Sequence, residues 1–128
     1  MNFPSVWITL RRNILMHLND YQFKAEMYAE YKDQMYPFFG LAEESGEALG
    51  VIAKSLRKRG VSGISGEVKG DMMNYVEVKL SDELGDVLWM LSACCAELGI
   101  TLQDIAEMNL TKLKIRKAAG AISDEERR

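Results

Sequence analysis

The 128-residue sequence has little of several residue types, and each shortage excludes a class of protein. Its two cysteines, Cys94 and Cys95, are neighbours and cannot form the spaced pairs of a disulfide framework, which favours a reduced, intracellular protein. The single histidine, His17, excludes the Glu-x-x-His pairs of a di-iron carboxylate site. Sixteen basic against nineteen acidic residues leave a net charge of −3, so the broad basic surface typical of nucleic-acid binding is absent.

Long apolar runs are also missing. No stretch approaches the ~18 continuous apolar residues of a membrane span. The mildly apolar stretch 3–10 is followed, not preceded, by Arg11 and Arg12, and no small-residue cleavage site comes after it, which argues against a signal peptide. We therefore expect a cytoplasmic protein with neither a membrane nor a nucleic-acid partner.

The hydrophobic pattern is helical throughout, because alternation with a period of two is scarce and only two prolines interrupt the chain. Asn19 followed by Gln22 resembles a capping box for the first helix, and Thr101 with Asp104 resembles one for the last. The glycine-rich stretch 60–70 reads as a flexible connection. The pattern predicts an all-α fold, a four-helix-type bundle, with helices over about 20–31, 38–59, 72–98 and 102–117.

The length suggests one domain, which we place at 19–117 between an N-terminal extension, 1–18, and a polar C-terminal tail, 118–128. The third predicted helix would be about 40 Å long at ~1.5 Å per residue, which is long for a domain of this size. Part of its apolar face is therefore expected to pack on another protomer, so that the chain oligomerises through helix faces. An early end or a kink in that helix is the alternative.

Four carboxylates form two pairs with helical spacing. Glu44 and Glu47 are three residues apart, as are Glu83 and Asp86, so each pair shares a helix face. Each pair borders an apolar seam, which on the third helix we expect to consist of Leu80, Leu84, Val87, Leu91 and Leu98. Like charges brought together there would repel unless a cation joined them, and ligands that are all carboxylate oxygens suit Mg²⁺ or Mn²⁺. The alternative is that both pairs are merely solvated helix faces.

Each carboxylate pair also encloses a glycine, Gly46 or Gly85, in the middle of a predicted helix. Glycine there costs ~1 kcal/mol relative to alanine, so its presence calls for a reason. We expect these small residues to let a facing helix or a hydrated ion approach closely.

The last predicted helix supplies the opposite charge. Asn109, Lys112 and Arg116 fall on the same face as its apolar residues, and Lys and Arg are natural partners of phosphate. The alternative is that these cations extend from the rim of the bundle into solvent. Trp89 and Tyr36 either stack on a base or belong to the core.

Three blocks of sequence resemble the MazG-like nucleotide pyrophosphohydrolases. The run GLAEESGEALG resembles their EExxE motif, LSDELGDVLWML their ExxD motif, and AELGITLQDIAEMNLTKLKIRK their C-terminal helix with its Asn-x-x-Lys-x-x-x-Arg pattern. The first motif alone is weak evidence, but the three in this order are specific, and together they cover about 19–117.

The resemblance implies an all-α dimer or tetramer that hydrolyses a nucleoside triphosphate, with Mg²⁺, to the monophosphate and pyrophosphate. It implies that the catalytic acidic group comprises Glu43, Glu44 and Glu47. In our own mechanistic hypothesis Glu44 or Glu47 is the general base. The metal ligands would be Glu44, Glu47, Glu83 and Asp86. The residues that hold the nucleotide would be Lys79, Asn109, Lys112 and Arg116.

The resemblance does not fix the substrate. Related all-α enzymes act on dCTP, dUTP or phosphoribosyl-ATP and share the same carboxylate pattern. A non-catalytic helical module that senses nucleotides or binds a protein is a further alternative, although all the carboxylates are retained in this sequence.

Overall fold

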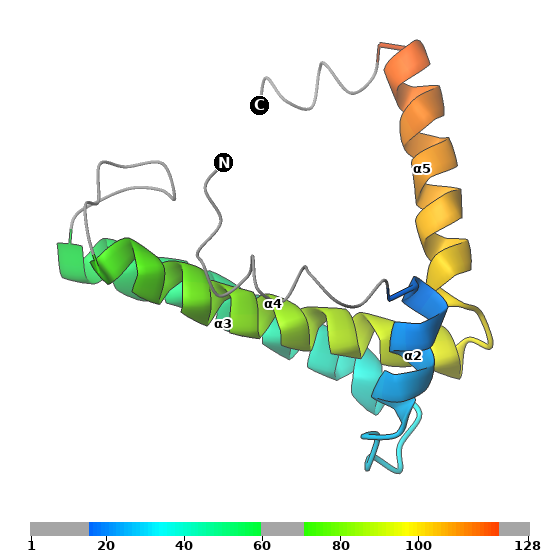
Figure 1. The fold of residues 1–128 in the computed structure, drawn as a ribbon, viewed down its shortest axis with the longest axis horizontal. Coiled ribbons are helices and arrows are strands. Elements are labelled where there is room, and N and C mark those ends of the chain that lie inside the picture. Colours follow the sequence, from blue (N-terminus) through cyan, green and yellow to red (C-terminus); the bar gives the residue numbers. More distant parts are fainter. Residues whose placement is uncertain (1–15, 60–70, 121–128) are drawn as a thin grey trace.

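The computed structural model describes residues 16–59 and 71–120. Within these ranges the chain forms helices only, which confirms the predicted all-α class for this part of the sequence. Most of the extension, 1–15, the stretch 60–70 and most of the tail, 121–128, lie outside the described residues. The helices are α2 (Leu18–Glu26), α3 (Tyr36–Arg59), α4 (Asp71–Glu97) and α5 (Leu102–Ala118) (Figure 1).

The two long helices, α3 and α4, lie side by side and antiparallel, and α2 crosses the C-terminal end of α4 (Figure 1). α5 then leaves α4 at a bend of 101° and extends away from the helix pair. It contacts α2 and α4, but among the described residues it makes no contact with α3. The core of the described residues therefore follows α4, which packs against α3, α2 and the start of α5.

The junction between α4 and α5 follows the sequence signals closely. Gly99 adopts a φ of +67°, which favours glycine, and the Ile100 amide donates to the Cys95 carbonyl at 3.0 Å, closing α4. At the start of α5, the Asp104 amide donates to the Thr101 Oγ1 at 3.0 Å, while the Thr101 amide donates to the Asp104 carboxylate at 3.3 Å. This is the capping box predicted from the sequence.

The first helix begins and ends earlier than predicted. Its N-cap is His17, whose amide donates to the Asp20 carboxylate at 3.3 Å, so the capping box predicted at Asn19 and Gln22 is wrong. α2 ends at Glu26, and the amides of Met27 and Tyr28 bond three residues back in turns instead of continuing the helix. The local sequence pattern assigned Gln22 to a capping box, whereas its side chain is buried and bonds to residues far along the chain.

Gln22 ties α2 to the turn between α4 and α5. Its Nε2 donates to the Ile100 carbonyl at 3.1 Å, and its Oε1 accepts from the Leu102 amide at 2.6 Å. The amide of Leu102 is one of the unpaired donors at a helix start, and this buried side chain satisfies it. The direction in which α5 leaves the core is thus held by one residue of α2.

The buried face of α4 is rotated from the predicted seam. Leu84 is 53% exposed and Leu98 is 61% exposed, whereas Met90, expected beside the seam, is only 3% exposed. The buried face therefore lies closer to Glu83 and Asp86 than the apolar residues alone indicated. Cys94 and Cys95 are free and buried, as expected of small core residues.

No single helix among the described residues is long and apolar enough to span a membrane. α4 and α5 meet that test only when taken together across their bend, by length and composition alone.

Candidate metal and phosphate site

A close crossing of α3 and α4 sets the geometry of the site. A Cβ atom added to Gly40 would lie 2.6 Å from the Met90 Sδ, so Gly40 makes room for the Met90 side chain where the two helices cross. Gly40 is one turn before Glu44 on α3, and Met90 is one turn after Asp86 on α4. The crossing therefore holds the two carboxylate-bearing turns against each other.

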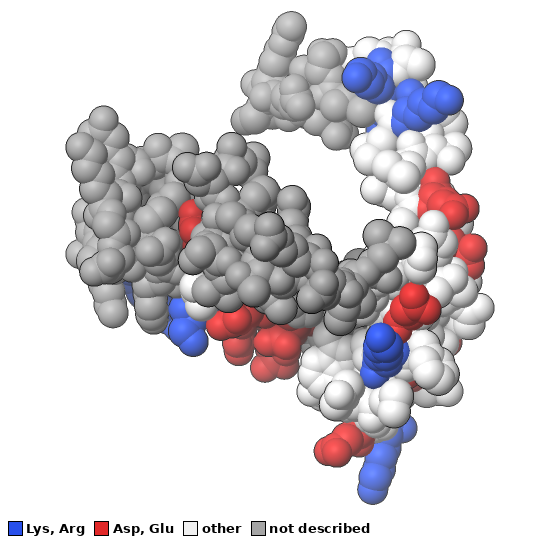
Figure 2. All heavy atoms as spheres, in the orientation of Figure 1, with Lys and Arg blue, Asp and Glu red and all other residues white. Residues whose placement is uncertain are grey.

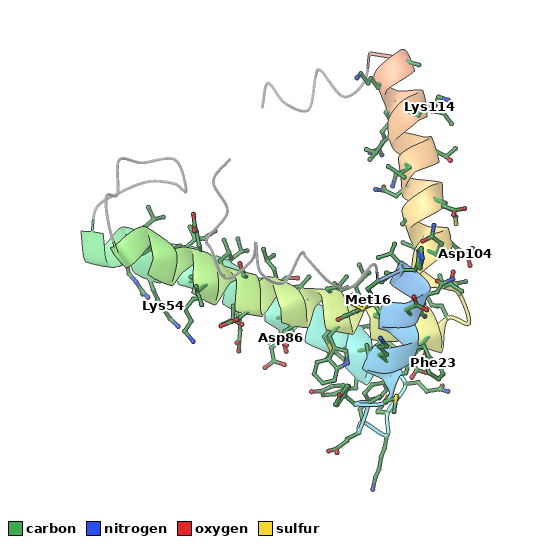
Figure 3. The ribbon with its side chains drawn as sticks, in the orientation of Figure 1. Met16, Phe23, Lys54, Asp86, Asp104 and Lys114 are labelled. Atoms are coloured by element: carbon green, nitrogen blue, oxygen red, sulfur yellow. The ribbon has the colours of Figure 1, made fainter. Side chains whose placement is uncertain are left out.

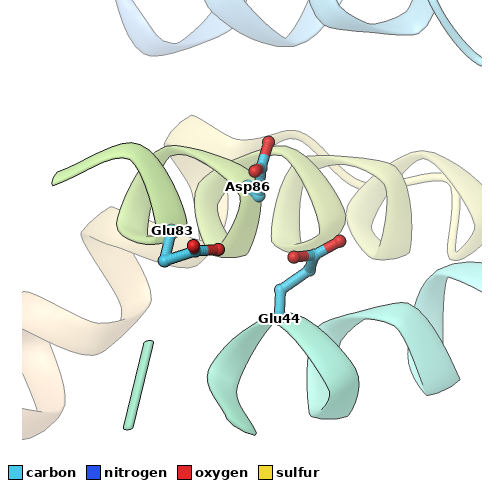
Figure 4. Close-up of side chains that lie close together, drawn as sticks. All are labelled: Glu44, Glu83 and Asp86. Carbon is cyan, nitrogen blue, oxygen red and sulfur yellow. The ribbon is translucent and has the colours of Figure 1, made fainter. Parts of the chain in front are cut away.

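Three carboxylates converge beside this crossing. One carboxylate oxygen from each of Glu44, Glu83 and Asp86 lies within 4.8 Å of the others, and we call these residues the acidic cluster. Glu44 points from α3 toward α4, which carries the other two (Figure 4). Acidic side chains also gather on the outer surface of the helix pair (Figure 2), where Asp86 points away from the core (Figure 3).

Glu44 is the electrostatic centre of the cluster. Partial burial raises the pKa of the Glu44 carboxyl above its ordinary value, and repulsion from neighbouring carboxylates raises it further. These neighbours, in decreasing order of effect, are Asp86, Glu47, Glu43 and Glu83. Repulsion of this kind favours any species that brings positive charge between the oxygens.

The donor set fits a hard divalent cation. Carboxylate oxygens are the ligands that Mg²⁺ and Mn²⁺ prefer, and no cysteine or histidine belongs to the group. Two of the three carboxylates, those of Glu44 and Glu83, are half-buried, so their charges are less well solvated than those of a free helix face.

The remaining predicted residues of the helix pair lie around the cluster. Glu47 and Glu43 are exposed on α3, and Glu47 is not among the three residues whose oxygens meet. Lys79 is exposed on α4, one turn before Glu83 on the same face. These positions surround the cluster with further carboxylates and one cation.

Tyr21, on α2, is a neighbour of the cluster that the sequence did not indicate. Burial raises the pKa of its phenol, and the Asp86 carboxylate raises it further, which places the ring near that charge. No local pattern distinguishes Tyr21, because its position depends on how α2 crosses α4.

The predicted phosphate-binding residues of α5 are not brought to the acidic cluster within one chain. Asn109, Lys112 and Arg116 are all exposed, and no described residue of α5 contacts α3. Lys112 and Arg116 instead share the wall of a hollow of about 510 Å³ on α5. The predicted four-helix bundle would have placed these residues opposite the carboxylates. The 101° bend between α4 and α5 instead directs α5 away from α3.

The glycines within the carboxylate motifs do not serve a helix contact in the described chain. A Cβ atom at Gly46 or Gly85 would meet no described atom within 4 Å beyond its own surroundings in the helix. Gly40, which the motif analysis did not single out, is the glycine at the helix crossing.

The described residues form helices only, with a carboxylate cluster between the two long helices whose donor set suits a hard cation. Residues 38–120 match the family model of the MazG nucleotide pyrophosphohydrolase domain, and the chain belongs to this family. It is also 33% identical, over 117 residues, to the gene 37 protein of Mycobacterium phage L5, an alignment that covers 84% of this chain and 94% of that protein. No solved structure gave a match.

Proposed function

We propose that the chain is a Mg²⁺-dependent nucleoside triphosphate pyrophosphohydrolase, which converts a (d)NTP and water into the (d)NMP and pyrophosphate. The observation that carries this proposal is the convergence of Glu44, Glu83 and Asp86 from two helices onto one point. Membership of the family supports the reaction, since the matched model is that of a nucleotide pyrophosphohydrolase domain.

The acidic cluster would hold Mg²⁺, with Mn²⁺ as a substitute, and Glu47, one turn from Glu44 on α3, would join it. When bound, the ion would supply positive charge to the phosphate oxygens and lower the pKa of a coordinated water. The role of the half-buried Glu44 and Glu83 is to fix the position of that charge relative to the substrate. Asp86, which is exposed, would complete the ligand set from the solvent side.

Glu44 or Glu47 would also orient the attacking water and accept its proton, with Glu43 supporting them from the same stretch of α3. The water oxygen forms a bond to the α-phosphorus, and the bond from that phosphorus to the bridging oxygen breaks. Pyrophosphate leaves with the bonding electrons. Lys79, one turn before Glu83, is positioned to offset the charge that develops on it.

The cations of α5 reach the acidic cluster, in this proposal, from a second copy of the chain. From Glu107 onward every described residue of α5 is exposed, including four large apolar side chains, an arrangement that favours burial against another molecule. The basic end of α5 complements the acidic cluster in charge. A homodimer or homotetramer would thus bring Asn109, Lys112 and Arg116 to the phosphates.

The experiment that tests the proposal measures pyrophosphate release from the eight common NTPs and dNTPs, with Mg²⁺ and with EDTA. We expect metal-dependent release with the monophosphate as co-product, and loss of release in Glu83→Gln. Glu77→Gln is a matched control, because Glu77 lies on the same helix but outside the cluster.

Equal release by Glu83→Gln and the parent protein would refute the scheme. Release confined to dCTP or dUTP, or seen only with phosphoribosyl-ATP, would narrow the substrate. Mg²⁺-dependent thermal stabilisation without turnover of any substrate would favour the non-catalytic module instead.

A further inference from the structure

Next to the acidic cluster lies a cavity of about 600 Å³ with an aromatic lining, which we call the aromatic cavity. Trp89 and Met90 form its wall on α4, and Tyr28, Tyr31 and Tyr36 come from the connection between α2 and α3 and from the start of α3. Four of the eleven aromatic residues of the chain thus meet at one place. This concentration is not explained by the core, because Tyr28 is 74% and Tyr36 48% exposed.

The aromatic cavity begins one helical turn from the acidic cluster. Trp89 follows Asp86 by three residues on α4, which separates the two side chains by only ~5–6 Å at their Cβ atoms. A ligand whose phosphates lie over the carboxylates would therefore have its remaining part beside the rings. The distance suits the ribose that separates a base from its first phosphate.

The tyrosines of the cavity are held in place before any ligand binds. Tyr31 and Tyr36 are stacked, with ring centroids 5.6 Å apart and an angle of 22° between the rings. Burial raises the pKa of the Tyr31 phenol to about 12, as does its hydrogen bond to the Glu97 carboxylate, so the phenol stays protonated and anchored. Asp33 fixes the loop, because its carboxylate accepts from the Met35 amide at 2.8 Å.

The rim of the aromatic cavity is polar. Lys32 offers donors and Glu30 offers acceptors, which are the two kinds of group that a nucleobase edge requires. A planar ring of a ligand can stack on the exposed tyrosines while its edge meets these side chains, and such stacking stabilises binding whichever base is present.

The tyrosine wall belongs to a part of the chain outside the family match. The matched residues begin at 38, whereas the three tyrosines lie between 28 and 36. The acidic cluster lies inside the matched part, and the three tyrosines lie outside it. The residues proposed to bind the metal therefore belong to the family domain, whereas the tyrosines are a feature that can differ between relatives.

We propose that the aromatic cavity is the nucleobase subsite of this chain, in which the base stacks on Tyr36 and Trp89 while the phosphates lie over the acidic cluster. The proposal rests on the proposed function for the placement of the phosphates. It adds that binding depends on the base itself and not only on the sugar and phosphates.

The test uses the fluorescence of Trp89 in the full chain. Trp7 and Trp89 are the two tryptophans of the sequence, so the substitution Trp7→Phe leaves Trp89 as the single reporter. Nucleoside monophosphates are expected to quench or shift its emission saturably, whereas ribose 5-phosphate and inorganic phosphate are not. Tyr36→Ala is expected to weaken nucleotide binding about 5- to 100-fold, and Tyr36→Phe, which keeps the ring, to bind like the parent.

Two further variants protect the test against a folding defect. Tyr28→Ala removes a mostly exposed ring of the cavity and is expected to weaken binding less than Tyr36→Ala does. Phe39→Ala removes an equally exposed ring of α3 that does not line the cavity, and it is expected to bind like the parent. In turnover, Tyr36→Ala is expected to raise KM with little change in kcat.

Two results would overturn the subsite: equal quenching by ribose 5-phosphate, or unchanged nucleotide affinity in both Tyr36→Ala and Tyr28→Ala. Failure of the proposed function is distinguishable from these results. Saturable quenching by nucleotides without any pyrophosphate release would retain the subsite and refute the enzyme. Metal-dependent hydrolysis that is unaffected by the two tyrosine variants would retain the enzyme and refute the subsite.

Discussion

The two halves of α4 are built on opposite principles. Toward its C-terminus, Ala93, Cys94 and Cys95 are buried, and the turn that follows has its polar groups paired by Gln22. Earlier in α4, around Glu83 and Asp86, most side chains are exposed or only half-buried. The carboxylates of these two residues lie close to that of Glu44, and the acidic cluster contains no positively charged side chain. One half buries small side chains against its neighbours, and the other concentrates like charge.

In our proposal this difference separates the half of the helix that serves stability from the half that serves binding. Paired, buried groups hold the position of neighbouring helices, and removing one of them costs free energy. Clustered carboxylates raise the free energy of the folded chain until a cation joins them, and this cost is the reason for proposing a cation at the acidic cluster. In this proposal the same helix carries a structural end and a metal-binding middle.

The largest expected effect tests whether α5 of a second copy supplies the positive charges that complete the acidic cluster. Glu83→Gln and Arg116→Ala are each expected to lower activity on the order of 100-fold, because each removes one charge from the site. If α5 acts on a second copy, the two variants co-expressed form mixed dimers in which one site is intact. Activity should then recover to roughly a quarter of the parent value, since half of the dimers are mixed and each has one of two sites.

Pyrophosphate release by the co-purified pair, set against each variant alone, is the measurement. Differently tagged copies allow the mixed assemblies to be isolated. An isolated mixed assembly no more active than the single variants would show that α5 does not complete the acidic cluster of another copy.

The next effect concerns the C-terminal half of α4 and the turn that follows it. Gln22→Ala is expected to lower the free energy of unfolding by about 2–3 kcal/mol, because it leaves the Leu102 amide and the Ile100 carbonyl without their partner. Urea denaturation followed by circular dichroism measures this change. Gln103→Ala is the control, since among the described residues the Gln103 side chain bonds to the exposed Glu107, at 2.7 Å, and its loss should cost ~0.5 kcal/mol or less. Equal losses in the two variants would contradict the structural role of Gln22.

The smallest effect concerns the like charges themselves. In the absence of metal, Glu44→Gln is expected to stabilise the fold by up to ~1 kcal/mol at neutral pH, since it relieves repulsion that solvent partly screens. Because the pKa of Glu44 is raised in the folded state, this gain should fade as the pH falls and the parent carboxyl becomes neutral. Thermal melting at several pH values measures it.

Added Mg²⁺ should reverse the order, raising the melting temperature of the parent more than that of Glu44→Gln. An identical Mg²⁺ response in the two proteins would mean that Glu44 holds no cation. Glu77→Gln, outside the cluster, should respond to Mg²⁺ as the parent does.

Much of the fold was predictable because its signals are local. The capping box of Thr101 and the stop at Gly99 depend on residues close in sequence, and helical spacing alone pairs Glu83 with Asp86. The direction of α5 was not predictable, because it depends on a bond from Gln22 across 80 positions of the chain. The same holds for Tyr21, whose approach to Asp86 follows from the crossing of α2 over α4.

The short helix α2 touches both halves of α4, through Tyr21 near Asp86 and through Gln22 at the turn before α5. Its nine residues are too few for a stable isolated helix, so it must open and close together with the contacts that it makes. Amide hydrogen exchange at Leu102 should therefore report on the whole of α2. An ion or substrate that orders the surroundings of Asp86 would then slow exchange of the Leu102 amide at the start of α5. The exchange rate of this one amide would therefore report binding at the middle of α4.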